Sequence, residues 1–193
     1  MNSKNMFLLV LVVSVFCFLF TGCGTTRYMA EGNGSKPLYL KNNIHVQQRV
    51  DEYRGSYANW TEPSSGHVVI PVNTIVEIDY KRSYFVITDK DKGRKAEIEY
   101  DESNMGMNTE QYLKLITSTT PVALDHFSDI DRKGITDGKA YIGMSKDGVR
   151  VALGYPARHR TASLESNTWV YWRGRFGTRA IDFDSAGKVS GIK

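Results

Sequence analysis

The hydrophobic pattern opens with a long apolar run near the N-terminus. Residues 6–20 are apolar apart from Ser14, and Lys4 places a positive charge just before them. Fifteen helical residues at about 1.5 Å each would extend only about 22 Å, which is short of a hydrocarbon core roughly 30 Å thick. Residues 1–22 are therefore predicted to be a secretory signal peptide and not a membrane-spanning helix.

Between residues 38 and 102 the apolar positions fall in short runs that favour strands. The clearest is the second arm of an expected hairpin, where Ala96, Ile98 and Tyr100 alternate with charged side chains. The expected strands are residues 38–40, 44–46, 67–70, 74–80, 84–88 and 94–100. This succession predicts a small β-barrel, and the sequence IPVNTIV at residues 70–76 weakly resembles the strand-turn-strand of bacterial SH3-like modules.

A helix and a connector are expected at residues 103–130. The helix covers residues 108–117, with Thr109 as its N-cap. Its apolar stripe consists of Tyr112, Leu113 and Ile116. This stripe is expected to pack on the barrel.

The last 63 residues, 131–193, change to two helices followed by strands. The first helix is expected at residues 131–139. The second begins at Ser145 and ends at Gly154, which is placed as a left-handed cap. Strands are then expected at residues 168–173, 178–183 and 189–193. The fold class predicted for the whole chain is α+β, a barrel-like module followed by two helices and a three-stranded antiparallel sheet.

Four motifs in this C-terminal region follow one another in a recognisable order. They are Gly143-Met144-Ser145, Ala152-Leu153-Gly154-Tyr155-Pro156, Asn167-Thr168-Trp169-Val170-Tyr171 and Phe183-x3-Gly187-x-Val189. In order and spacing they resemble the SmpA/OmlA (BamE-like) outer-membrane lipoproteins. The resemblance implies a helix-helix-three-strand module and a non-catalytic accessory role in the assembly of outer-membrane β-barrel proteins. Simple members of that family have no counterpart of residues 38–130.

The same resemblance implies a contact surface for a partner lipoprotein and phosphatidylglycerol around the helix-to-strand turn. The corresponding positions are Tyr155, Ala157, Arg158 and Val170. Trp172 joins them because an exposed tryptophan beside Arg173 and Arg175 would mark a binding face. The alternative for each position is an ordinary loop or strand residue. Trp169, in contrast, is expected to be a core residue.

Cys23 directly follows the apolar run and its small residues. The sequence Leu19-Phe20-Thr21-Gly22-Cys23 resembles the bacterial lipobox, which implies cleavage before Cys23, a diacylglycerol on its sulfur and an acylated amine. Residue 24 is glycine and not aspartate. By resemblance to Gram-negative lipoproteins, this implies that the protein is anchored in the outer membrane and faces the periplasm. An ordinary signal peptide with an incidental cysteine is the alternative.

The polar residues 23–37 would then form a flexible tether. The second cysteine, Cys17, lies in the segment that would be removed. A mature chain without a further thiol has no disulfide, no thiolate metal site and no cysteine nucleophile.

Charge is divided unevenly along the chain. Residues 131–193 carry twelve Lys/Arg against six Asp/Glu, whereas residues 23–130 carry twelve against fifteen. In an exported protein, the basic region favours an anionic lipid or an acidic envelope protein over nucleic acid as a partner. Solubility alone is the alternative explanation.

No constellation of residues indicates catalysis, a cofactor or a metal. The four histidines, at positions 45, 67, 126 and 159, do not have the spacing that is typical of metal ligands. His159 near Ser163 and Glu165 offers a base and a nucleophile without evident oxyanion donors. We therefore expect no enzyme, but a lipid-anchored binding or scaffold protein of the envelope, in outer-membrane protein assembly or envelope integrity. A peptidoglycan-binding or hydrolase-inhibitor-like envelope protein is the alternative.

Overall fold

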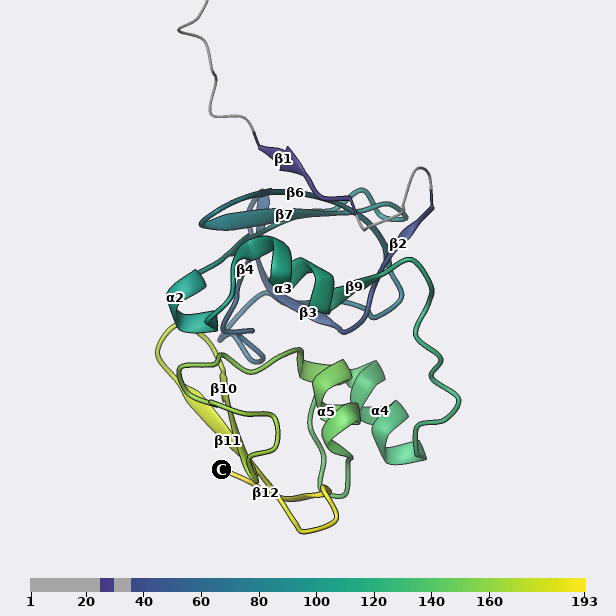
Figure 1. Cartoon of the computed structure of the whole chain (residues 1–193), viewed down its shortest axis with the longest axis vertical. Helices are drawn as coiled ribbons and strands as arrows, with labels where there is room; N and C mark the ends of the chain where they lie inside the picture. The colour runs from purple at the N-terminus through teal and green to yellow at the C-terminus, as the bar shows by residue number, and fades with distance from the viewer. Residues whose placement is uncertain (1–24, 30–35) are drawn as a thin grey trace, which may run out of the picture.

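The computed structural model describes residues 25–29 and 36–193 of the chain (Figure 1). The predicted signal peptide at residues 1–22 and the predicted lipid-attachment residue Cys23 lie outside these residues. Within the described ranges, no helix combines the length and the apolarity that crossing a bilayer requires.

Nine strands form one curled, mixed sheet, a half-barrel (Figure 1). They are β1 (Thr26–Arg27), β2 (Leu38–Leu40), β3 (Ile44–Arg49), β4 (Glu52–Ser56), β5 (His67–Ile70), β6 (Ile75–Lys81), β7 (Tyr84–Asp89), β8 (Lys95–Glu99) and β9 (Thr117–Ser118). The main order is β5-β3-β4-β8-β7-β6-β2-β9, and β1 also pairs with β6. The one parallel pair of this sheet in the described residues is β4 with β8.

The β7–β8 hairpin confirms the alternation seen in the sequence. Ala96 and Ile98 of β8 are buried, whereas Lys95, Glu97 and Glu99 are exposed. The period of two follows from the pleat, which sends successive side chains to opposite faces. The inner face of the sheet therefore builds the first core, and the outer face of β8 carries charge.

Two short helices add apolar side chains to this first core. α2 covers Glu102–Met105 and α3 covers Thr109–Ile116. The predicted apolar stripe on α3 is confirmed, because all three of its residues are buried. The N-cap is Asn108 and not Thr109: the Asn108 side chain accepts from the Gln111 N–H at 2.9 Å, and Gln111 Oε1 accepts from the Asn108 N–H at 3.0 Å.

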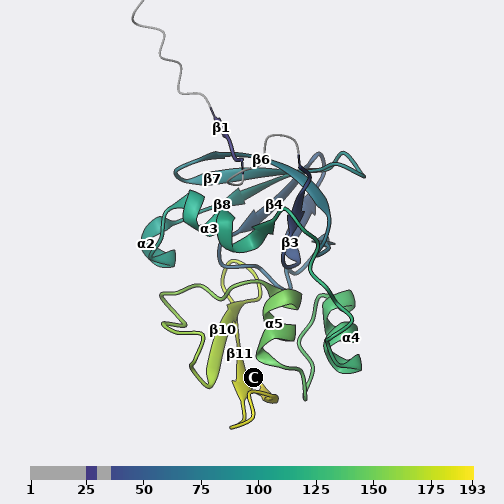
Figure 2. The same ribbon diagram turned by 45° about the vertical axis from the view of Figure 1, so that its right-hand side comes forward.

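The C-terminal part contributes two helices and a separate sheet (Figure 2). They are α4 (Asp129–Asp137), α5 (Lys146–Leu153) and the antiparallel strands β10 (Thr168–Trp172), β11 (Thr178–Phe183) and β12 (Val189–Ile192). Ser145 caps α5 as predicted, with its Oγ accepting from the Gly148 N–H at 2.9 Å. Gly154 ends α5, but its φ of 81° and ψ of −169° are not the left-handed helical conformation that was expected.

Helices α4 and α5 lie close together around one buried carboxylate. Asp131 accepts hydrogen bonds from the Ser128 hydroxyl at 2.6 Å and from the Ser145 backbone at 2.7 Å. Burial alone would raise the pKa of Asp131, but these hydrogen bonds outweigh burial and hold its pKa below the usual value. A Cβ on Gly148 would lie 2.1 Å from Asp131 Oδ1, so glycine is required for this approach.

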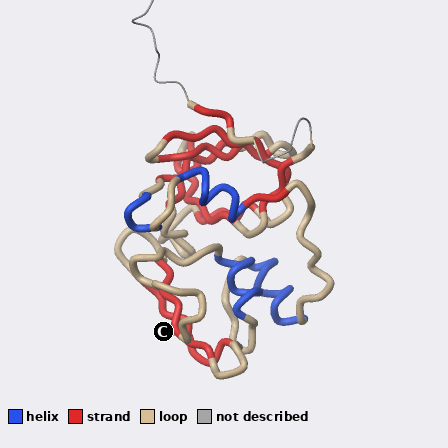
Figure 3. Tube along the Cα trace, viewed as in Figure 1, coloured by secondary structure: helices blue, strands red, loops and turns tan. Residues whose placement is uncertain are grey.

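The predicted fold class is wrong. Most of the ordered structure is strand (Figure 3): a nine-stranded half-barrel and a three-stranded sheet, with four short helices in the described residues. This arrangement is neither a small closed barrel nor an independent helix-helix-three-strand module. Apolar side chains of α4, α5 and the three-stranded sheet form a second core. One physical reason for the difference is that this second core also takes Val72, Val122 and Leu124 from outside residues 131–193.

The segment expected to be a flexible tether contains a paired strand. Thr26 and Arg27 of β1 pair with β6, and the Tyr28 N–H donates to the Ile78 carbonyl at 2.8 Å. The Tyr28 side chain is only 4% exposed and belongs to the first core. The fold therefore includes residues 26–28.

Buried polar groups join the half-barrel to the C-terminal part. Asn43 Nδ2 donates to the Ile135 carbonyl at 2.7 Å, and Asn43 Oδ1 accepts from the Val72 N–H at 2.8 Å. The Asn43 N–H donates to the Val151 carbonyl at 2.8 Å. Because buried polar groups are costly when unpaired, these bonds fix the position of α4 and α5 against the sheet.

His45 lies at the same junction, and its hydrogen bonds define its tautomer. Nε2 faces the Ala152 carbonyl at 2.8 Å, so it must carry the proton and donate. Burial lowers the pKa of His45 and keeps its ring neutral, so Nδ1 carries no proton and accepts from His67 Nε2 at 2.9 Å. The two rings are nearly parallel, with centroids 5.2 Å apart. His45 is thus held as a neutral ring that bridges β3 and α5.

Candidate binding groove

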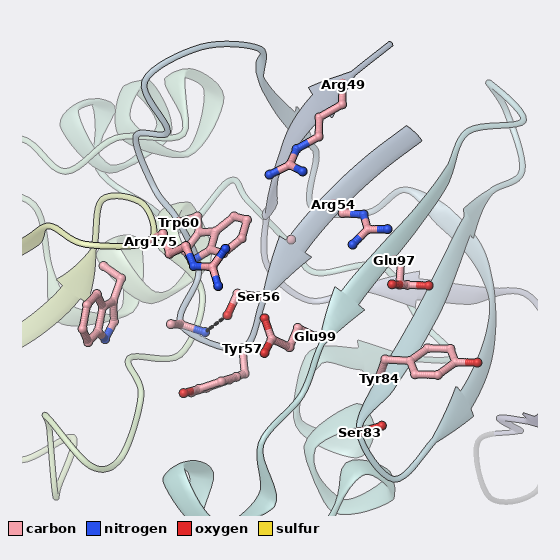
Figure 4. Close-up of a pocket in the computed structure, with 13 residues that line it drawn as sticks. Arg49, Arg54, Ser56, Tyr57, Trp60, Ser83, Tyr84, Glu97, Glu99 and Arg175 are labelled. Carbon is pink, nitrogen blue, oxygen red and sulfur yellow. Dashed lines mark hydrogen bonds between the residues drawn. The ribbon is translucent and has the colours of Figure 1, made fainter. Parts of the chain in front are cut away.

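A groove opens where the outer face of the half-barrel meets β10 and the β10–β11 turn (Figure 4). Its volume is about 530 Å³, within the usual range of ligand sites. The residues around it are Arg49, Arg54, Gly55, Ser56, Tyr57, Ala58, Trp60, Ser83, Tyr84, Glu97, Glu99, Trp172 and Arg175. We call this site the interface groove.

The parallel pairing of β4 with β8 builds the sheet side of the interface groove. In this register Arg54 lies opposite Glu97, and Ser56 lies opposite Glu99. Gly55 between them allows close packing, because a Cβ there would lie 2.6 Å from the Ile98 side chain. Polar side chains from two distant parts of the sequence are therefore brought onto one outer surface.

A strained turn presents the aromatic side of the groove. Asn59 and Trp60 both have positive φ angles, 74° and 35°, which non-glycine residues rarely adopt. The turn is held by Asn59 Nδ2, which donates to the Tyr155 carbonyl at 2.6 Å, and by the Thr61 N–H, which donates to the Trp172 carbonyl at 2.8 Å. Such conformations cost about 1–3 kcal/mol each and occur often at functional sites.

Trp172 adds a buried donor without a partner. Its indole Nε1 is buried, and no acceptor for it exists among residues 25–29 and 36–193. An unsatisfied buried donor costs about 1–3 kcal/mol. The ring itself lies near His159 and Arg160, at 6.3 Å between ring centroids and 6.0 Å from the guanidinium carbon.

The charges around the groove are only partly compensated. Arg54 pairs with Glu52 at 2.8 Å. In the part of the chain that the structure describes, no ion pair and no side-chain hydrogen bond involves Arg49, Arg175, Glu97 or Glu99. The groove therefore carries free charges of both signs.

Two exposed apolar side chains directly follow groove arginines in the sequence, Val50 after Arg49 and Phe176 after Arg175. Val50 is 95% exposed at the tip of the β3–β4 hairpin, and Phe176 is 90% exposed in the β10–β11 turn. Phe176 lines a second hollow of about 400 Å³ that shares Arg49, Trp60 and Arg175 with the interface groove. The two hollows are therefore neighbours.

The groove offers little for catalysis. Neither histidine nor cysteine is among its lining residues, and Ser56 Oγ accepts from the Ala58 N–H at 3.2 Å. His159 and Ser163 share no hydrogen bond in the described residues, since Ser163 Oγ accepts from the Glu165 N–H instead. No cluster of three or more potential metal ligands occurs in those residues either.

The five positions expected to meet a partner differ in their exposure. Ala157 is 1% exposed in the first core, so its side chain is not available to a partner in this structure. Tyr155 is half-buried, and its hydroxyl accepts from Arg150 at 2.9 Å. Arg158 is exposed and donates to the Gly106 carbonyl at 3.4 Å. Val170 and Trp172 share the outward face of β10, and of the five only Trp172 lines the groove.

Comparison with known proteins finds no matching protein family, no matching curated protein and no matching solved structure.

Sequence reasoning singled out Trp172 and Arg175 but not the other groove residues. Trp60 gave one usable signal, because a tryptophan in a polar loop after Asn59 is unusual for an unconstrained segment. Arg49, Arg54, Glu97 and Glu99 gave none. Their proximity depends on the β4–β8 pairing, which joins segments about 40 residues apart.

Proposed function

We propose that this protein is a non-catalytic, lipid-anchored binding protein of the bacterial envelope and that the interface groove holds its partner. The observation that carries the proposal is the groove itself, with free charges of both signs, two tryptophans and a strained turn. Its lining lacks a nucleophile paired with a base, which favours binding over chemistry. The proposed location is the outer membrane, facing the periplasm.

The proposed anchor is Cys23, and the fold begins very near to it. Three peptide units separate Cys23 from Thr26, so covalent geometry keeps their Cα atoms within about 11 Å. Since Thr26 is paired in the sheet, acyl chains on Cys23 would hold the half-barrel close to the bilayer surface. More than one chain would make that attachment stable, because a single chain binds only marginally.

The anchor is tested by replacing Cys23 with serine. We expect the wild-type protein to incorporate labelled palmitate and to fractionate with membranes, and the C23S protein to lose both properties. Cys17→Ser is the matched control and should change neither. Membrane fractionation of C23S that equals the wild type would refute the anchor.

The binding role is tested by photo-cross-linking in intact cells from position 97, inside the groove. Position 92 in the β7–β8 turn is exposed and lies outside the groove, so it serves as the control. We expect one discrete envelope protein to be captured from position 97 and not from position 92. Identical capture patterns from the two positions would count against the groove as the binding site.

A further inference from the structure

We infer that the interface groove binds an extended polypeptide segment in which an acidic and a basic side chain are close together. This inference rests on the proposed function and names the class of partner. It is carried by four free charges, two cationic and two anionic, that surround a single depression (Figure 4).

Charge complementarity selects a ligand of mixed sign. Arg49 and Arg175 have no acidic partner in the described residues, so a carboxylate of the ligand would satisfy them. Glu97 and Glu99 likewise form no ion pair in the described residues, since Arg54 opposite Glu97 pairs with Glu52, so an ammonium or guanidinium of the ligand would satisfy them. A ligand with only one sign of charge would leave two like charges facing it, which reduces both affinity and specificity.

The shape of the site favours a chain over a compact molecule. The main groove shares Arg49, Trp60 and Arg175 with the second hollow beside Phe176, so the two hollows are neighbours. The tryptophan rings provide apolar surface for the aliphatic parts of side chains, and the exposed Phe176 adds apolar surface in the second hollow. An extended segment can occupy both hollows at once.

An anionic bilayer is the competing occupant. The arginines and the exposed Val50 and Phe176 would suit it, since apolar tips flanked by arginines bind membrane interfaces. Glu97 and Glu99 would face the same surface and be repelled by anionic headgroups. The presence of both signs in one depression therefore favours the polypeptide.

The test uses four capped nine-residue peptides that differ only in charge. One contains neighbouring aspartate and lysine, one aspartate alone, one lysine alone, and one neither. Calorimetric titration of the purified protein is expected to show tightest binding of the peptide with both charges. The affinity should fall as salt rises, because the contacts are electrostatic.

Two double variants identify the residues. Arg49→Gln with Arg175→Gln should weaken the peptide with both charges about tenfold, to the level of the lysine-only peptide. Glu97→Gln with Glu99→Gln should weaken it by a similar factor, to the level of the aspartate-only peptide. Asp91→Asn with Lys92→Gln, in the exposed β7–β8 turn, is the matched control and should leave the affinity within about twofold.

Several results would overturn the inference. They are binding of none of the peptides, equal binding of all four, equal effects of the three double variants, or tighter binding to phosphatidylglycerol vesicles than to any peptide. Each of these leaves the proposed function testable on its own, because the palmitate label and the cross-link from position 97 do not depend on the ligand class.

Discussion

Trp169→Ala is expected to lower the free energy of unfolding by about 3–5 kcal/mol. The Trp169 side chain is 2% exposed, and its ring lies edge-on to Phe183 with centroids 4.9 Å apart. Its indole N–H donates to the Leu164 carbonyl at 3.2 Å, so truncation also removes a hydrogen bond. The change therefore combines a large cavity with the loss of this hydrogen bond, although Lys146 Nζ still donates to the Leu164 carbonyl. Urea denaturation of the purified protein measures the loss.

Trp172→Ala provides the matched control three residues along the same strand. Trp172 is half-buried on the opposite face of β10 and does not belong to the second core. We expect its truncation to cost much less, about 1 kcal/mol. If the two alanine variants lost the same stability, the assignment of Trp169 to the core would be wrong.

The protein is expected to lose about 3 kcal/mol of stability as the pH falls from about 7 to about 4. Burial lowers the pKa of His45 from 6.5 to about 4, with His67 adding to the effect and the hydrogen bond to Ala152 opposing it. Burial also lowers the pKa of His67. Between these pH values the unfolded chain binds protons that the folded chain does not bind, so acid favours unfolding. The stability is complete above about pH 6.5 and declines below it.

The groups around the histidine pair do not reverse this sign. Glu62 opposes the lowering of the His67 pKa, and Lys139 reinforces it. Carboxylates with depressed pKa values, such as Asp131 and Asp89, lose their contribution only below their ordinary value near pH 4, so the two effects occupy different windows.

Urea denaturation in steps from pH 7.5 to pH 4.5 measures the histidine effect. His45→Gln keeps a donor for the Ala152 carbonyl and should flatten the profile, whereas His126→Gln, at an exposed histidine, should leave the slope unchanged. A wild-type stability that stays constant over this range would show that His45 is not held neutral.

The elements that sequence predicted well are those set by local spacing. The stripe of α3, the Ser145 cap of α5 and the β7–β8 alternation each lie within a window of about ten residues. Trp169 could be assigned to the core for the same reason, because β10 alternates buried and half-buried side chains. The N-cap of α3 was misplaced by one residue, since Asn108 and Thr109 are both good caps.

The candidate site could not be predicted in this way. The interface groove needs the parallel β4–β8 pair, whose first strand, Glu52–Ser56, has too few apolar residues to stand out. It also needs the β10–β11 turn to lie against the Trp60 segment, more than a hundred residues away. Ala157, a position taken from the family resemblance, is buried in the first core, because the segment after α5 folds its side chain inward.

By itself, the sequence determined the helices and strands that have a clear apolar period, such as α3, α5, β8 and β10, and which of their faces are buried, because the periods of helix and strand act between near neighbours. It also supplied the argument for a lipid anchor at Cys23, which lies outside the described residues. The tertiary structure alone decided the half-barrel, the Asn43–His45 junction and the groove with its charges of both signs. These features depend on pairing free energies between distant segments, and no local window of the chain contains both partners.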